Sequence, residues 1–366
     1  VSSPFSTSVT WWRPAALLIW PSSSSGDGTA TAARRRPAPT EAATARSRRL
    51  AAGITAEVTA TLTSVANAAP IVAVTVVAGD NLARKAAASI GETLSAELGV
   101  SSTYFGPVSS RPVIRGQFGE RVRVLTNGLD SLDASAFSED HQVTAESLLA
   151  QRIEIVRGPA ALLYGSGAAG GLVNVVDTRF VQEPLDKPFN AGVALGADTA
   201  AGIRDGAVRT QFGTGNIAFS ADYFYRSTDD IEIPGFAESK ALRELEEAEG
   251  GEGEEGEEEA FGVVENTNSE TSGGALGVSF LSDNGFVGLS FSGFDSEYGI
   301  PGHHHEEEGE VPLPGEPVEE EEMVRIDLEQ ARVDLAGEYD LEGRFLRGIR
   351  FRAAVNDYEH TELEGE

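Results

Sequence analysis

The chain has 366 residues, enough for one large or two ordinary domains, and its 40% apolar content excludes a wholly disordered protein. A formal net charge of -30 argues against nucleic acid and anionic lipid as partners and favours cations. The absence of cysteine excludes disulfides and thiolate metal sites, so any bound metal would need His, Asp, Glu or water as ligands.

The N-terminal region is divided by composition. Residues 1–45 contain tryptophans, a serine run and an arginine triplet without repeat or alternation, and we interpret them as disordered or as outside the mature protein. Residues 46–68 run from a basic start through a weakly apolar middle to a small-x-small site, the order of a secretory signal with cleavage after Ala68. Because Glu57 interrupts the apolar part, an Ala-rich helix remains the alternative.

The next stretch alternates between strand and helix patterns. Residues 71–78 are apolar and β-branched, and residues 81–98 have helical spacing. The face of this helix predicted to pack on a small sheet carries Leu82, Ala86, Ile90, Leu94 and Leu98. Two strands, a polar loop and a short helix are predicted at residues 101–118, 120–129, 130–143 and 144–150. The second strand ends in a turn at Asn127-Gly128, and the loop contains Asp140 and His141.

Residues 151–179 have the most distinctive pattern in the chain. An alternating strand breaks at Gly158-Pro159, one helical turn follows, and a glycine-rich turn precedes a new strand at Leu172. The GSGAAGG run lacks the Lys-Ser/Thr pair of a phosphate-binding loop, and a strand rather than a helix follows it. This context argues against a nucleotide site.

The same residues resemble the end of the plug domain of TonB-dependent outer-membrane receptors. The family pattern is matched by Arg152-Ile153-Glu154-Ile155, Arg157-Gly158-Pro159, Tyr164-Gly165 and Gly171-Leu172-Val173-Asn174-Val175-Val176. Upstream, residues 111–116 and 121–128 resemble earlier plug strands in the correct order. The resemblance implies an α+β plug domain at residues 69–186.

Two further roles follow from this resemblance. In the family, a segment placed like residues 71–78 pairs with the TonB energy-coupling complex by strand addition, but here it could equally be the first plug strand. The matched residues Arg115, Arg157 and Tyr164 are expected to hold the plug in place by hydrogen bonds and ion pairs.

Residues 187–366 show strand-like alternation, whereas no run of about eighteen apolar residues suited to a membrane helix is present. We predict about seven antiparallel transmembrane strands, at residues 189–199, 204–213, 216–226, 272–281, 286–296, 325–338 and 346–358. The lipid-facing sets are Phe219, Ala221, Tyr223 and Tyr225; Leu276, Val278 and Phe280; and Ile349, Phe351, Ala353 and Val355. The opposite faces carry Ser220, Asp222, Ser279, Ser290, Arg350 and Arg352.

Turn lengths predict the orientation of these strands. Short turns at residues 213–215, 283–285 and 341–344 alternate with long segments at 228–270 and 297–324. Because short turns are periplasmic in outer-membrane barrels, the long acidic segments should be extracellular. Seven strands cannot close around a plug, so we interpret the chain as the N-terminal part of a barrel resembling one of roughly 22 strands, an incomplete barrel.

Candidate metal ligands lie in polar contexts. His303, His304 and His305 begin a His-Glu-rich run, which we interpret as weak cation capture; the alternative is a solvated acidic loop. The segments STYFGPVSSRPVIRG and LDASAFSEDHQVT, with that run, resemble the zinc-uptake branch of the receptors. The resemblance implies that Asp140 and His141 help to hold the metal. His360 and Glu362, at the outer end of the last predicted strand, are candidate barrel ligands, although any His ligand from later strands is absent and leaves a complete tetrahedral site in doubt.

The sequence therefore predicts an outer-membrane receptor, not an enzyme, that imports Zn²⁺ or another divalent metal and contacts outer-membrane lipid and the TonB complex. A receptor for a siderophore, haem or cobalamin is the alternative within transport, although acidic loops would repel an anionic siderophore. From other classes, a surface β-structured adhesin or metal-binding protein lacks the plug pattern. A soluble zinc hydrolase would need ligand spacing such as H-E-x-x-H, which is not present.

Overall fold

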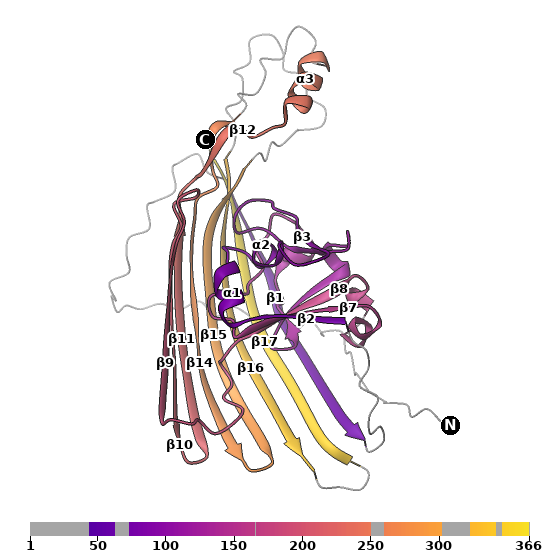
Figure 1. Cartoon of the computed structure of the whole chain (residues 1–366), viewed down its shortest axis with the longest axis vertical. Coiled ribbons are helices and arrows are strands. Elements are labelled where there is room, and N and C mark those ends of the chain that lie inside the picture. The colour runs from indigo at the N-terminus through magenta and orange to yellow at the C-terminus, as the bar shows by residue number, and fades with distance from the viewer. Residues whose placement is uncertain are drawn as a thin grey trace, which may run out of the picture.

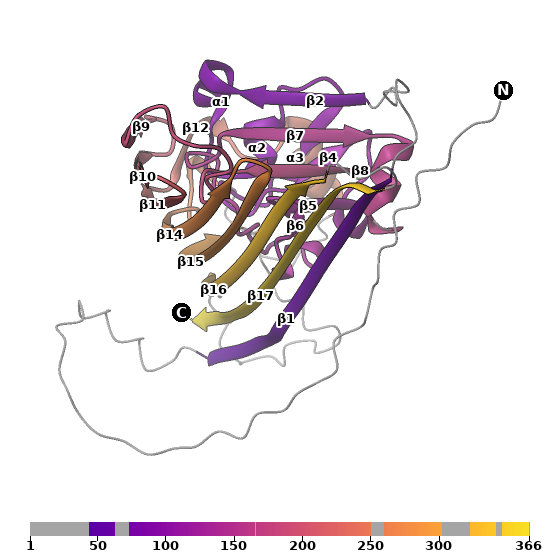
Figure 2. The same ribbon diagram turned by 90° about the horizontal axis from the view of Figure 1, so that it is seen from below.

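The computed structural model describes residues 44–62, 73–164, 166–249, 260–301, 323–341 and 346–365. These residues form a curved antiparallel sheet and a smaller mixed domain that lies on its concave side (Figures 1 and 2). Within these ranges, no helix has the length and apolar character needed to cross a membrane.

The large sheet has the strand order β1-β17-β16-β15-β14-β11-β10-β9. Seven of its strands are β9 (Phe189–Ala197), β10 (Arg204–Thr214), β11 (Ile217–Thr228), β14 (Ser269–Ser282), β15 (Gly285–Ile300), β16 (Met323–Asp340) and β17 (Leu346–Gly365). They coincide with the seven predicted strands, and several extend further than predicted where they join the long segments. The prediction of antiparallel strands in an incomplete barrel is confirmed.

The eighth strand, β1 (Thr44–Leu62), pairs with β17 at the edge of the sheet. It contains most of the stretch predicted to be a secretory signal, so that stretch is a strand here and not the Ala-rich helix considered as the alternative. Cleavage after Ala68 stays a prediction, and residues 1–43 lie outside the described residues.

The alternation predicted for the strands is present in the burial pattern. Phe219, Tyr223, Leu276, Phe280 and Val355 are exposed on the outer face of the sheet. The opposite positions, Ser220, Ser279 and Ser290 among them, are buried on the inner face of the sheet. Arg350 has the same parity on β17 as the buried Ala354, and it pairs with Glu338 at the exposed end of the strand.

Short and long connections lie at opposite ends of the sheet (Figure 1). Tight turns join β10 to β11 and β14 to β15, as predicted. The long segment between β11 and β14 carries three unpredicted elements, the paired strands β12 (Ile231–Phe236) and β13 (Phe261–Val264) and the helix α3 (Lys240–Glu249). The C-terminal end of β17 is at the same end of the sheet as this segment (Figure 1).

The smaller domain is built on a five-stranded sheet of order β2-β7-β8-β5-β6. Its strands are β2 (Ala73–Ala78), β5 (Val122–Thr126), β6 (Leu129–Asp130), β7 (Arg152–Arg157) and β8 (Gly171–Val176). β5 and β8 run parallel and the other pairs antiparallel. A separate pair is formed by β3 (Val100–Ser102) and β4 (Pro112–Ile114). Residues 73–78 thus form the first strand of this domain, the second of the two roles considered for them.

Turns in this domain follow the sequence patterns. Asn127 and Gly128 both have positive φ, 52° and 85°, as a tight hairpin turn between β5 and β6 requires. Gly171 has φ 139°, and a Cβ there would lie 2.9 Å from the carbonyl oxygen of Val156, so only glycine fits where β8 starts. Four 3₁₀ turns complete the connections: η1 (Gly119–Arg121), η2 (Ala134–Ala136), η3 (Pro159–Tyr164) and η4 (Ser166–Ala168).

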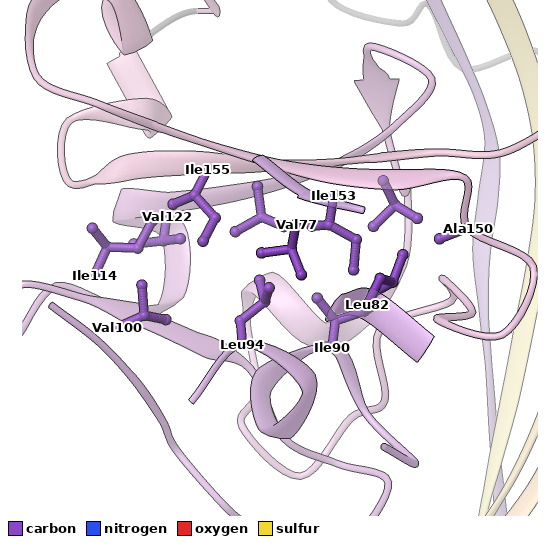
Figure 3. Packing of buried hydrophobic residues seen from close by; sticks show 12 residues of the cluster. Val77, Leu82, Ile90, Leu94, Val100, Ile114, Val122, Ala150, Ile153 and Ile155 are labelled. Carbon is purple, nitrogen blue, oxygen red and sulfur yellow. The ribbon is translucent and has the colours of Figure 1, made fainter. Parts of the chain in front are cut away.

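The core of the domain lies between this sheet and two short helices (Figure 3). Its buried members include Val77, Leu82, Ile90, Leu94, Val100, Ile114, Val122, Ile153 and Ile155. Burial of each large aliphatic side chain stabilises the fold by about 1.5–3 kcal/mol, and every member of this cluster belongs to the smaller domain.

Two helix predictions were wrong. The helix predicted over residues 81–98 is two pieces, α1 (Gly79–Lys85) and α2 (Ile90–Leu94), because Ala86 leaves the helical conformation and Ser89 caps a new helix by accepting from Glu92 N. Leu98 is 93% exposed, not on the packed face. Residues 144–150 form turns instead of a helix, since the Glu146 side chain bonds to the main-chain N–H of Leu148.

Candidate metal centre

The polar loop predicted at residues 130–143 is held by a buried carboxylate. Asp133 accepts hydrogen bonds from the main-chain N–H of Ser135 at 3.1 Å and of Thr144 at 3.0 Å, and from the hydroxyls of the same two residues. These bonds close the loop at its base, because they tie Thr144 to a side chain eleven positions earlier in the chain. Asp140 and His141 are therefore presented by a loop with fixed ends.

The imidazole of His141 is oriented by its neighbour. Its Nδ1 lies 2.8 Å from Oδ1 of Asp140, which also accepts from the Ser138 hydroxyl. Burial raises the pKa of Asp140, but the bonds from His141 and Ser138 outweigh it and lower that pKa to about 2. Because the carboxylate is ionised, it accepts a hydrogen bond from Nδ1–H of His141, and Nε2 is the ring nitrogen left to bind a metal. Carboxylates orient metal-binding histidines in this way.

The Nε2 atom of His141 faces two side chains from the inner face of β17. It lies 3.8 Å from Oε1 of Glu362, and Nε2 of His360 lies 3.6 Å from the same oxygen. The two imidazole rings meet edge to face with centroids 4.5 Å apart. A donor atom from each of the three residues lies within 4.8 Å of the others. His141 and His360 are buried, and Glu362 is half-buried.

This geometry suits a small cation. In a tetrahedral zinc site with bonds of about 2.0–2.1 Å, neighbouring donor atoms are about 3.3 Å apart. The two His–Glu separations of 3.6 and 3.8 Å would have to contract by a few tenths of an ångström, and the separation between the two imidazole donors, which is within 4.8 Å, by up to about 1.5 Å. His141 Nε2 is buried and makes no hydrogen bond within the described part of the chain, so a lone pair is directed into the group. Two imidazoles and one carboxylate are ligands that zinc and other divalent transition metals accept.

The predicted site residues are thus partly brought together. His141, His360 and Glu362 meet although more than two hundred residues separate the first from the others along the chain. Asp140 adjoins them but stands behind His141, outside the three-residue group. His303, His304 and His305 lie outside the described residues.

Charged contacts that were not predicted from the sequence join the two domains elsewhere on the inner face of the large sheet. Arg226, on the inner face of β11, donates to both carboxylate oxygens of Glu146 at 2.9 and 3.0 Å and to the Ala88 carbonyl at 3.2 Å. Arg179 bonds Asp334 of β16 at 3.2 Å. Arg226 lies on the same face of β11 as Ser220 and Asp222, which were predicted to point inward. The alternation of the strand could therefore have predicted that Arg226 also points inward.

The residues proposed to hold the plug in place act mainly inside it. Arg157 bonds the Thr75 hydroxyl at 2.8 Å and the Leu98 carbonyl at 3.0 Å, and the Tyr164 carbonyl accepts from Arg123. Arg115 is one of the few non-glycine residues with positive φ, at 51°. Thr75 and Leu98, the two hydrogen-bond partners of Arg157, belong to the same small domain, which fits a structural role.

Residues 68–172 match the family model described as the TonB-dependent Receptor Plug Domain. The chain is similar to a hemin receptor of Yersinia pestis, with 31% identity over 160 residues, 43% of this chain and 21% of that protein. It is also similar to the ferric enterobactin receptor PirA of Pseudomonas aeruginosa, with 36% identity over 104 residues, 28% of this chain and 11% of the relative.

Among solved structures, the copper transporter OprC matches with a TM-score of 0.55 at 16% identity, covering 80% of this chain and 38% of that one. At this identity the likeness shows the fold alone. The chain spans about a fifth or less of the length of the curated relatives it matches.

Proposed function

We propose that this chain, a TonB-dependent receptor of the outer membrane with its plug domain at residues 68–172, takes part in the import of a metal-containing ligand. The observation that carries the proposal is the group of His141, His360 and Glu362, which joins the plug to the inner face of the large sheet. A metal held there would be bound by both domains at once. Release toward the periplasm would then require the plug to move, for which TonB supplies the force.

Two substrate classes have separate support. The hemin receptor and the ferric enterobactin receptor favour haem or a ferric siderophore, the alternative considered from the sequence, over zinc. The donor set favours a bare divalent cation such as Zn²⁺, the finer proposal of a zinc-uptake branch. Haem iron bound between His141 and His360 would require the two rings, now in edge contact at 4.5 Å, to separate and admit the macrocycle.

Coupling through the segment near residues 71–78 is also proposed. Among the described residues β2 pairs with β7 alone, so its other edge offers main-chain groups for strand addition by a partner. That the protein makes no chemical change to its ligand stays a prediction.

Titration calorimetry on the intact receptor in detergent separates the substrate classes. Zn²⁺, haemin and a ferric siderophore would each be titrated into the parent and into His141→Ala and His360→Ala variants. Tight Zn²⁺ binding lost in both variants supports the divalent-ion proposal. Chelate or haemin binding that survives both substitutions, without Zn²⁺ binding, supports the alternative and leaves the three-residue group without a role in transport.

A further inference from the structure

The hydroxyl of Tyr298 bridges the two peptide groups that flank His141. Tyr298 lies on the inner face of β15 and is fully buried. Its oxygen accepts from the main-chain N–H of Gln142 at 2.9 Å and donates to the main-chain carbonyl of Asp140 at 3.0 Å. One side chain of the large sheet thus holds both sides of the His141 backbone.

The position of Tyr298 in the sheet relates it to the metal centre. Tyr298 is opposite Ile326 on β16, and Ile326 is opposite Glu362 on β17, so the three residues form one row across adjacent strands. With strands about 4.8 Å apart, Tyr298 lies about 10 Å from Glu362 along this row, on the same face. The row therefore has the candidate ligand Glu362 at one end. At its other end is Tyr298, which is hydrogen-bonded to the loop that carries the candidate ligand His141.

The ring of Tyr298 is itself fixed by packing. It belongs to a buried cluster with Ile300, Val324, Ile326, Leu328 and Tyr358. A buried tyrosine hydroxyl needs hydrogen-bond partners, and here both partners belong to the plug loop. The loop segment at residues 138–142 has no strand or helix of its own, so these two bonds substitute for regular main-chain pairing.

We propose that Tyr298 is a positioning residue for metal binding, which sets the height and direction of His141 relative to His360 and Glu362. The inference rests on the proposed metal centre. The separations of 3.6 and 3.8 Å leave little tolerance, because a displacement of His141 by about 1 Å would take its Nε2 out of reach of a shared ion. Tyr298 touches no donor atom of the group and acts through the backbone.

The test uses Co²⁺ as the probe, because its visible absorption reports the number and arrangement of ligands. Tyr298→Phe removes one hydroxyl and keeps the ring. Tyr358→Phe is the matched control, since Tyr358 is also buried in the same cluster and, among the described residues, no hydrogen bond joins its hydroxyl to the loop at residues 138–142. The intact receptor in detergent would be titrated in both variants, in the parent and in His141→Ala.

Tyr298→Phe is expected to weaken Co²⁺ binding about tenfold, the lower limit for residues that orient a ligand, and to alter the absorption spectrum. Tyr358→Phe should match the parent in both. Parent-like affinity and spectrum for Tyr298→Phe, with binding still lost in His141→Ala, would overturn the positioning role and leave the metal centre standing. Absence of Co²⁺ binding in the parent, or its persistence in His141→Ala, would overturn the metal centre and the inference with it.

Discussion

Replacing Glu146 with alanine is expected to loosen the plug, because the change leaves Arg226 buried without its main partner. The side chain of Arg226 is 1% exposed and that of Glu146 is 7% exposed. Removing one member of a buried ion pair costs about 3–5 kcal/mol. Asp205 stays 3.5 Å from Arg226 and the Ala88 carbonyl stays at 3.2 Å, so we expect the lower end, about 3 kcal/mol.

Hydrogen exchange of the plug amides in the intact receptor measures this loss. If the plug opens as a unit, about 3 kcal/mol raises the exchange rate of the β5 and β8 amides on the order of 100-fold. Glu338→Ala is the matched control, because it removes the same kind of pair from an exposed site, where Glu338 is 37% and Arg350 47% exposed. Such a surface pair contributes about 0–1 kcal/mol. Equal plug exchange in the Glu146→Ala and Glu338→Ala variants would refute the reasoning.

Three further outcomes are expected. Replacing Asp140 and His141 together with alanine should weaken Zn²⁺ binding more than deletion of residues 303–305, and equal affinities by calorimetry would remove the site from this loop. Burial raises the pKa of Asp140, but hydrogen bonds from His141 and Ser138 outweigh it and lower that pKa to about 2. The stabilisation of the loop by the charged Asp140 is therefore fully present above about pH 4 and is lost as the pH falls through about 2. Acid should therefore loosen the loop at residues 138–142 only below about pH 4, and amide hydrogen exchange of this loop, corrected for the intrinsic rate, that already rises well above pH 4 would contradict this. Gly91→Ala should destabilise the plug by about 1–3 kcal/mol in denaturant unfolding, because its Cβ would lie 2.7 Å from facing main chain, whereas Gly235→Ala, with open space, should not.

The strands were predictable from the sequence because their alternation records two different environments. Phe219 and Ser220 are adjacent in the chain, yet one is exposed on the outer face and the other is buried on the inner face of the sheet. The family pattern at residues 152–176 was predictable for a related reason, since glycine at positions such as Gly171 is required by local backbone geometry. Both patterns are local in the sequence, so they can be recognised without knowledge of the tertiary structure.

The detailed site depended on longer-range contacts, whereas the break in the predicted helix had a local signal. Ser89 with Glu92 three residues later is the pattern of a helix start, and the continuous apolar spacing over residues 81–98 does not show it. His360 and Glu362 were identified as candidates from residue type and strand end, but their meeting with His141 depends on how the plug docks. Tyr298 gave no signal by residue type, since its role lies in two bonds to distant main-chain atoms.

X-ray absorption at the zinc edge, on the intact receptor loaded with one equivalent of Zn²⁺, tests the metal centre most directly. We expect imidazole scattering from two histidines and a carboxylate oxygen, with bonds of about 2.0–2.2 Å, and loss of one imidazole in His360→Ala. An oxygen-only shell, or a spectrum unchanged by His360→Ala, would contradict a metal centre formed by His141, His360 and Glu362.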